Sequence, residues 1–204
     1  MGFISVQIIV ILKSMNTELK NKPIIAISGV GGAGKNSVMD IFKKYPDRFS
    51  FFVSYTDRLQ REDDVPGGTY HFISKEEFSK AIEDGEFMEW EKVRGEYRYG
   101  RKKEDLEKII QSGKIPVMQI DVKGVVKFKK DYNILSFFIV PPSKEDALAR
   151  MRKRGTDSEE AIQDRINRYD LEMGYKDQYD HVIINDDLEK AQQELLKTVD
   201  SRIK

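Results

Sequence analysis

The stretch "ISGVGGAGKNSV", Ile27 to Val38, has the spacing of a phosphate-binding loop: a Gly, four residues, then Gly-Lys. Before it, Pro23 to Ser28 is a short, continuous apolar run that is typical of a buried parallel strand. After it, "KNSVMDIFKKY" places apolar residues at helical spacing and ends before Pro46. Strand, glycine loop and helix therefore follow one another in the order that separates a nucleotide-binding loop from a chance glycine turn.

Each residue type in this loop suits a bound phosphate. Gly29 and Gly34 let backbone N–H groups turn toward phosphate oxygens, and Lys35 can reach the β and γ phosphates of a nucleotide. Asn36 stands where a Ser or Thr usually ligates Mg²⁺, but Mg²⁺ keeps several waters, so the Asn36 amide, the Ser37 hydroxyl or a water can replace that ligand. We therefore predict a working nucleotide site formed by Gly29, Gly32, Ala33, Gly34, Lys35, Asn36 and Ser37.

The composition excludes several classes of function. The 204 residues include 35 Lys plus Arg and 35 Asp plus Glu, so no net charge favours nucleic acid or a membrane surface as a partner. The absence of Cys excludes disulfides, thiolate nucleophiles and cysteine-based zinc sites, and two His leave little for a His-rich metal site. We expect a cytoplasmic protein whose phosphate contacts come from a local cluster.

The N-terminus differs from the rest of the chain. Its apolar run "FISVQIIVIL", Phe3–Leu12, is about half the length of a membrane-spanning helix. No clear basic segment precedes it and no clear cleavage site follows it, so a secretory signal is the less favoured interpretation. We expect residues 1–21 to be a disordered extension or the result of a misjudged start upstream of Met15, and residues 22–204 to form one domain with insertions.

Further apolar runs are predicted to be buried strands. They span Ile115–Asp121, Ile134–Val140 and His181–Asn185, and they alternate with amphipathic segments. This alternation is typical of an α/β fold with a parallel sheet covered on both faces. From Ser143 to about Met173 the chain is charged throughout, with a helical pattern on both sides of Gly155.

The segment between the first predicted helix and the next predicted buried strand differs from the rest of the chain in composition. Its aromatic and β-branched residues are broken by Pro66-Gly67-Gly68, so we expect a small strand-rich insert. Within it, Ser74 and Glu77 form the pattern of a capping box, and the helix that they begin is expected to end at Gly85.

The insert also carries residues suited to a second, smaller phosphate. Arg58 and Arg61 follow Ser54 closely, and Tyr70 comes soon after them. Guanidinium groups bind phosphate oxygens in a fork, and a hydroxyl adds a further donor. The alternative interpretation is an ordinary solvated surface.

Glu89 is another candidate in the insert. It lies in "GEFMEW" among apolar residues, so we predict that its carboxylate is held in a pocket, where it can accept two N–H groups from a guanine edge. The alternative is an acid at the end of a helix. We interpret the neighbouring Trp90 as packing that positions Glu89.

In order and spacing, these segments resemble the guanylate kinase family, whose members move a phosphoryl group from ATP to GMP. The resemblance runs from about Pro23 to Leu195 and rests on the glycine loop, "VSYTDR", "GGTYHFISKEEF", "GEFMEW", "YG" at Tyr99-Gly100, "IDVKG", "PPS", "RKRGTDSEEAI" and "INDDLEKA". It implies a P-loop NTPase core with a parallel sheet (22–52, 104–144 and 175–204), a strand-rich GMP-binding insert (53–103) and a helical lid (145–174). It also implies ATP and GMP as substrates, Mg²⁺ bound with ATP as the cofactor, and a monomer or homodimer.

The resemblance assigns roles to single residues. Ser54 and Glu89 match positions on the guanine base, and Asn185 matches a position near the adenine. Arg154 and Arg165 match lid arginines that grip ATP and the transferring phosphoryl group. The positions that match contacts to the GMP phosphate are Arg58, Arg61, Tyr70 and Tyr99. Arg101 and Asp121 complete the set predicted to bind GMP. The predicted catalytic residues are Lys35, Arg58, Arg154 and Arg165.

Four positions depart from the family pattern. Asn36 replaces the hydroxyl residue of the loop, and Gln119 replaces the first acid of a "DID" strand end whose second acid is Asp121, which weakens the acidic anchoring of hydrated Mg²⁺. Arg98 is an apparent insertion in "YRYG". Arg101 replaces a Thr or Ser that donates to guanine O6, and an Arg can either donate in a fork to O6 and N7 or block the pocket.

Two other functions fit part of the sequence. One is a related P-loop kinase with a different phosphorylated acceptor, and the other is a non-catalytic scaffold of this fold that binds protein partners. Ser54 and Glu89 favour guanine, whereas Arg101 leaves the first alternative open. Lys35 and the lid arginines are retained, which disfavours the scaffold.

Overall fold

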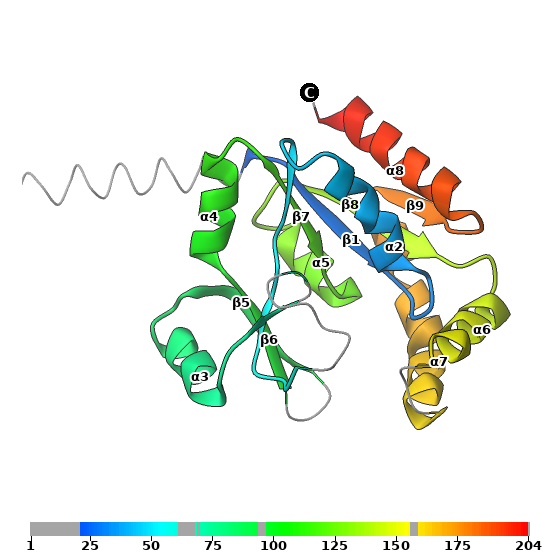
Figure 1. Ribbon diagram of the computed structural model, residues 1–204, viewed down its shortest axis with the longest axis horizontal. Helices are drawn as coiled ribbons and strands as arrows, with labels where there is room; N and C mark the ends of the chain where they lie inside the picture. The colour runs from blue at the N-terminus through cyan, green and yellow to red at the C-terminus, as the bar shows by residue number, and fades with distance from the viewer. Residues whose placement is uncertain (1–20, 61–67, 69, 94–96, 156–158, 204) are drawn as a thin grey trace, which may run out of the picture. The chain divides into compact units, whose positions relative to one another are not determined.

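The computed structural model describes residues 21–60, 68, 70–93, 97–155 and 159–203 (Figure 1). Residues 1–20 of the predicted N-terminal extension, Arg61 and Pro66-Gly67 lie outside these residues, and only the backbone of Val93 and Arg154 is described. The chain divides into two compact units, Met1–Phe49 with Gln119–Lys204, and Ser50–Met118. The first unit is therefore split in sequence, whereas the second is continuous.

The first unit is built on parallel strands. β1 (Ile24–Gly29), β8 (Ile134–Val140) and β9 (His181–Ile184) are neighbours in the order β1-β8-β9. β1 and β8 pair in parallel with Ile24 opposite Ile134, and β8 and β9 are also parallel. Every residue of β1 is buried, as its unbroken apolar sequence predicts. The predicted α/β fold with a parallel sheet is therefore confirmed.

Helices connect and follow these strands. They are α2 (Lys35–Met39), α5 (Val122–Phe128), α6 (Lys144–Arg154), α7 (Glu159–Met173) and α8 (Leu188–Arg202), with a short 3₁₀ turn η2 (Lys176–Gln178) before β9. Gly155, with φ 69°, ends α6, so the predicted helices on both sides of this glycine are confirmed. Within the described ranges, no helix is long and apolar enough to cross a membrane.

The helix after the glycine loop is shorter than its pattern predicts. α2 ends at Met39, and a 3₁₀ helix, η1 (Asp40–Lys44), continues the segment. Tyr45 closes η1 by donating its backbone N–H to Phe42 O at 3.0 Å, which is the i→i−3 bond of this tighter helix. The apolar side chains of the segment are buried as expected, because residues three apart share a face in both kinds of helix.

The second unit contains a four-stranded sheet in the order β4-β3-β6-β5. Its strands are β3 (Tyr55–Thr56), β4 (His71–Phe72), β5 (Phe87–Val93) and β6 (Tyr97–Lys102). β6 pairs antiparallel with β3, with Thr56 opposite Tyr99, and antiparallel with β5 on its other side. The predicted strand-rich character of this region is thus confirmed.

One helix of this unit packs on a small core. α3 (Lys75–Glu83) buries Phe78 and Ala81 against Phe87 of β5. The predicted capping box is present, since Ser74 Oγ accepts from Glu77 N at 3.0 Å and Glu77 Oε2 accepts from Ser74 N at 2.7 Å. The remaining elements are α4 (Lys103–Gln111), β2 (Phe49–Phe51), which begins at the unit boundary, and β7 (Ile115–Gln119), most of which lies in this unit.

Candidate active site

The glycine loop between β1 and α2 has no room for side chains at two of its positions. Gly32 (φ 77°) and Gly34 (φ 79°) adopt the left-handed backbone conformation that favours glycine. A Cβ on Gly32 would lie 2.4 Å from Ala147 O of α6, and one on Gly34 would lie 2.5 Å from Asn185 Nδ2. Both glycines are therefore required by backbone conformation and by close neighbours.

Lys35 begins α2 and keeps its ammonium group at the loop. Nζ donates to Gly29 O at 2.8 Å and to Val30 O at 2.9 Å, so the side chain folds back over the residues that precede it. This geometry puts a positive charge at the mouth of the loop. Asn36 and Ser37, in the first turn of α2, are exposed.

Asn185 ties the end of β9 to the glycine loop. The residue is 5% exposed, and its side-chain Nδ2 donates to Ala33 O at 2.8 Å. Its backbone N–H donates to Val140 O, and its carbonyl accepts from Arg150 Nη2 of α6 at 2.9 Å. The resemblance predicts Asn185 near the adenine, and the structure gives its amide a further role as a support of the loop.

Arg165, one of the two arginines predicted to belong to the lid, lies in α7 beside the glycine loop. A Cβ on Gly31 would lie 3.4 Å from the Arg165 Cβ and 3.5 Å from Met151 Sδ of α6. Lys35, Asn185 and Arg165 therefore surround the same loop. The side chain of Arg154 lies outside the described atoms, so its role stays a prediction.

Asp121 begins α5 and does not extend the preceding strand. Its Oδ1 accepts from the backbone N–H groups of Lys123 at 2.8 Å and Gly124 at 2.9 Å. The predicted strand over Ile115–Asp121 thus stops at Gln119, because a helix N-cap fixes Asp121. Close by, the Tyr179 hydroxyl donates to Val122 O at 3.5 Å, and burial raises the pKa of Tyr179 to about 12.

In the second unit, three of the side chains predicted to bind the GMP phosphate form one cluster. The Arg58 guanidinium is buried and lies 5.5 Å from the ring centre of Tyr70 and 5.4 Å from that of Phe72. The rings of Tyr70 and Tyr99 are 5.4 Å apart. The fourth, Arg61, lies outside the described residues. A guanidinium beside two phenol rings is suited to one small anion.

Glu89 and Arg101 form an ion pair across neighbouring strands. Arg101 Nη1 donates to Glu89 Oε1 at 2.6 Å. The side chain of Arg101 is 7% exposed and that of Glu89 is 25% exposed. The Arg101 guanidinium also lies 5.8 Å from the ring centre of Phe52. Ser54, the other residue predicted to contact the base, is buried in the same unit.

The surroundings of Glu89 correct two expectations. Glu89 lies in β5, so the alternative of a helix-end acid is wrong. The interpretation of Trp90 as packing that positions Glu89 is also wrong, because Trp90 is 47% exposed and successive strand residues point to opposite faces. Arg101, three strand positions from the apparent insertion at Arg98 in β6, takes the place expected for Trp90.

Sequence reasoning missed one buried pair in this unit. Arg98 appears in the sequence only as an insertion, but its Nε donates to Asp57 Oδ2 at 2.6 Å. The two residues are 41 positions apart, so no local pattern joins them. Their opposite charges would have been a signal only once β3 and β6 were known to be neighbours.

The loop with its lysine and the separate arginine and tyrosine cluster are typical of a P-loop kinase that acts on a small phosphorylated acceptor. The sequence model of the guanylate kinase family matches residues 20–202. The chain is 39% identical over 185 residues to the guanylate kinase of Helicobacter pylori, with 89% of each chain covered. It is 37% identical over 179 residues to that of Thermotoga maritima, covering 87% of this chain and 86% of the relative.

A solved structure agrees with these sequence relatives. The crystal structure of guanylate kinase from Anaplasma phagocytophilum matches with a TM-score of 0.68 at 26% identity, covering 91% of this chain and 88% of that chain. The chain belongs to the guanylate kinase family. Its activity is that of a nucleoside monophosphate kinase, an ATP:GMP phosphotransferase, as the resemblance predicts.

Proposed function

We propose that the two units divide the reaction, with ATP bound at the glycine loop of the first unit and GMP bound by the strands of the second. The observation that carries this proposal is the Arg58 cluster, which lies in the same unit as the Glu89–Arg101 pair. One group can bind a phosphate and the other can bind the polar edge of a base, which are the two ends of a nucleoside monophosphate.

On the donor side, transfer needs positive charge around the γ phosphate, because charge spreads over its oxygens as the bond to the leaving group lengthens. Lys35 supplies this charge from the loop, and Arg165 supplies it from α7. Arg154 adds a further cation in the role that the family pattern predicts. Asn185 supports the loop by donating from its side chain to the carbonyl of Ala33.

Mg²⁺ fits this site as an ion held chiefly by the nucleotide. Among the residues that the structure describes, no group of three or more His, Asp or Glu could hold a metal. The oxygen donors at hand are single exposed groups: Asn36, Ser37, Gln119 and Asp121. Mg²⁺ commonly takes one or two protein oxygens and completes its shell with phosphates and waters, so these residues suit it. When bound, it neutralises charge on the β and γ phosphates.

On the acceptor side, Arg58, Tyr70 and Tyr99 hold the GMP phosphate, with Arg61 as a further donor. The Glu89 carboxylate accepts from guanine N1–H and the 2-amino group, and Ser54 adds a hydroxyl. Arg101 donates to guanine O6 and N7. Because Arg101 also pairs with Glu89 at 2.6 Å, base recognition depends on both residues together.

This pair is also the observation that favours a second candidate function. A carboxylate already bonded to Arg101 has less capacity for a guanine edge, so a related kinase with a different phosphorylated acceptor is the alternative.

The test is a coupled assay of ADP release with ATP and Mg²⁺ against GMP, dGMP, AMP, UMP, CMP and IMP, with an Arg101→Thr variant run alongside. We expect turnover with GMP and with dGMP, and little with AMP, whose edge reverses the donor and acceptor pattern. Turnover with none of the six, in a folded protein that binds ATP, would contradict GMP as the acceptor. A GMP activity that appears only in Arg101→Thr would show that Arg101 blocks the pocket.

A further inference from the structure

Asp57 and Arg98 form the most enclosed ion pair in the described part of the second unit. Asp57 is 1% exposed at its side chain and Arg98 is 17% exposed. Arg98 Nε donates to Asp57 Oδ2 at 2.6 Å, and the backbone N–H of Arg98 donates to Asp57 Oδ1 at 2.6 Å. Both oxygens of the carboxylate are therefore bonded to the same residue, one through its side chain and one through its backbone.

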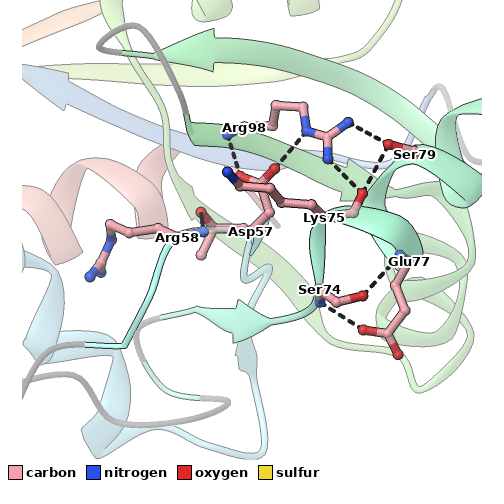
Figure 2. A network of polar contacts seen from close by, with 8 residues as sticks. Asp57, Arg58, Ser74, Lys75, Glu77, Ser79 and Arg98 are labelled. Atoms are coloured by element: carbon pink, nitrogen blue, oxygen red, sulfur yellow. Dashed lines mark hydrogen bonds and ion pairs between the residues drawn. The ribbon is translucent and has the colours of Figure 1, made fainter.

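The rest of the Arg98 guanidinium is fixed on α3 (Figure 2). Nη1 donates to Ser79 Oγ at 2.8 Å, and Nη2 donates to Lys75 O at 2.7 Å. The group also lies 4.7 Å from the ring centre of Phe78, in the core of this unit. Arg98 thus connects β6 to α3 and, through Asp57, to the end of β3. Each of the three guanidinium nitrogens has a hydrogen-bond partner.

Each member of the pair stands next in sequence to a residue of the predicted phosphate site. Asp57 precedes Arg58, and Arg98 precedes Tyr99. Tyr99 lies opposite Thr56 in the β3–β6 pairing, so Arg98 faces Asp57 at the next position along the two strands. Successive strand residues point to opposite faces, so a pair fixed on the α3 face sets the direction of Tyr99 on the other face. Figure 2 shows the Arg58 and Arg98 side chains leaving in opposite directions.

Features other than this ion pair also contribute to the stability of the unit. The unit already has an apolar core of Phe78, Ala81 and Phe87, and α3 has a complete capping box. Replacing a buried ion pair by apolar groups of similar size is often neutral for stability, because desolvation of the charges offsets their attraction. What the pair adds is a fixed geometry, since the planar guanidinium has one arrangement that satisfies all of its partners.

We propose that Asp57 and Arg98 are positioning residues for the acceptor phosphate. They lock the β3–β6 junction so that Arg58 and Tyr99 both face the phosphate on the far side of the sheet. This inference rests on the proposed function, because it takes that cluster as the GMP phosphate site. It adds two residues to the site that contact neither the phosphate nor the base.

The experiment measures the affinity of the full-length protein for GMP and for guanosine by calorimetry. Guanosine lacks the phosphate, so the ratio of the two dissociation constants isolates the phosphate contacts. The variants are Arg98→Met, Asp57→Asn with Arg98→Met, and Ser79→Ala, and the matched control is Lys102→Met. Lys102 forms an ion pair with Glu86 at 2.5 Å from the same strand, β6, but has no link to Asp57. Thermal midpoints and the KM for ATP are recorded for every variant.

The expected pattern separates positioning from stability. Arg98→Met alone lowers the thermal midpoint strongly, because it leaves the Asp57 carboxylate buried without its cation. The thermal midpoint of the double variant returns most of the way to the wild-type value. Its dissociation constant for GMP nevertheless stays about tenfold above the wild-type value, which is the size expected when one charged hydrogen bond is misplaced. Its affinity for guanosine and its KM for ATP stay at the wild-type values, as do all values for Lys102→Met.

Other results would overturn the inference. The pair has a structural role only if the double variant binds GMP as tightly as the wild type does. The same conclusion follows if its affinities for guanosine and for GMP fall by the same factor. If the double variant fails to fold, Ser79→Ala provides the test, because it removes one anchor of Arg98 and is expected to weaken GMP binding alone by about threefold. Unchanged GMP affinity in Ser79→Ala contradicts the proposal. A wild-type protein that neither binds nor phosphorylates GMP would instead remove the proposed function itself.

Discussion

The glycine loop and the acceptor cluster are both suited to phosphate, but they are built by opposite means. The loop uses backbone N–H groups, glycines in left-handed conformations and one lysine, all within a few positions of one another. The acceptor cluster uses side chains, and it brings together Arg58, Tyr70 and Tyr99 from separate segments of the second unit. A loop of backbone groups is fixed by local conformation, whereas a cluster of side chains depends on the pairing of distant strands. The two regions should therefore respond differently to substitution.

The largest expected effect is at the lysine of the loop. We expect Lys35→Ala to lower kcat by roughly two to three orders of magnitude, the usual cost of removing one group that stabilises transition-state charge. The fold should be largely unaffected, because the Lys35 ammonium donates to the backbone carbonyls of Gly29 and Val30 at the loop and lies outside the apolar core. The coupled assay and the thermal midpoint measure the two effects, with Lys190→Ala, an exposed lysine of α8, as the control. Near-normal turnover would remove Lys35 from the mechanism.

The next prediction compares substitutions at two glycines that have the same backbone angle φ. Gly32 and Gly113 both have φ 77°, but a Cβ on Gly32 would meet Ala147 O at 2.4 Å, whereas nothing lies within 4 Å of one on Gly113. We expect Gly113→Ala to cost about 1 kcal/mol of stability, from the backbone angle alone. Gly32→Ala should cost about 2 kcal/mol more, because a backbone oxygen cannot move aside.

Chemical unfolding followed by circular dichroism measures the two glycine variants. The KM for ATP should rise in Gly32→Ala and stay constant in Gly113→Ala. Equal losses of stability would mean that α6 yields at Ala147 and that the loop is less closely enclosed than its geometry indicates.

A smaller effect is expected at the side chain that supports the loop from β9. Asn185→Ala removes the 2.8 Å bond to Ala33 O, and we expect the KM for ATP to rise about tenfold, since one buried partner is lost. The KM for GMP should not change. Gln192→Ala is the control. Gln192 Nε2 of α8 donates to Ser37 O of α2 at 2.7 Å, so this variant also removes one side-chain bond to the segment after β1, but at an exposed position. A matching rise for GMP would contradict a role confined to the loop.

The smallest effect is expected at a single hydroxyl of the acceptor cluster. Tyr99→Phe keeps the ring contact with Tyr70 and removes one donor, so the KM for GMP should rise about fivefold while the KM for ATP stays constant. Steady-state kinetics with each substrate varied in turn measure both values. Tyr97→Phe, two positions away on β6, is the control. A change in the KM for ATP would mean that the two regions are not independent.

The same difference explains which parts could be predicted from sequence. The parallel strands, the glycine turn between β1 and α2 and the α3 cap depend on local patterns, and their predicted structures are confirmed. The 3₁₀ form of η1 was not predicted, since its apolar spacing suits both helix types. The predicted strand ends at Asp121, two residues beyond the observed end of β7 at Gln119, because hydrophobicity carries no information about the capping bonds of Asp121.

On the acceptor side, the residue types alone indicate a second phosphate near Arg58 and a base-binding carboxylate at Glu89, and the family resemblance adds the roles of single residues. Glu89 and Arg101 meet because β5 and β6 pair in one register, and Asp57 and Arg98 meet because β3 and β6 pair in another. Neither strand register can be deduced from the positions of charged residues in the sequence. From the sequence alone, Arg98 therefore has no partner and is interpreted as an insertion. The roles of all the predicted site residues remain predictions, and for Arg61 and Arg154 the side chains also lie outside the described residues.

The bond between Asn185 and Ala33 also has a consequence for how the protein is made. It joins residues 152 positions apart, so the loop leaves the ribosome long before the side chain that supports it. At roughly 5–20 residues per second, the interval is on the order of ten to thirty seconds. During that time the nascent chain carries a complete glycine motif without its support. We expect a nascent chain that has not yet reached Asn185 to hold ATP less tightly than the folded protein does.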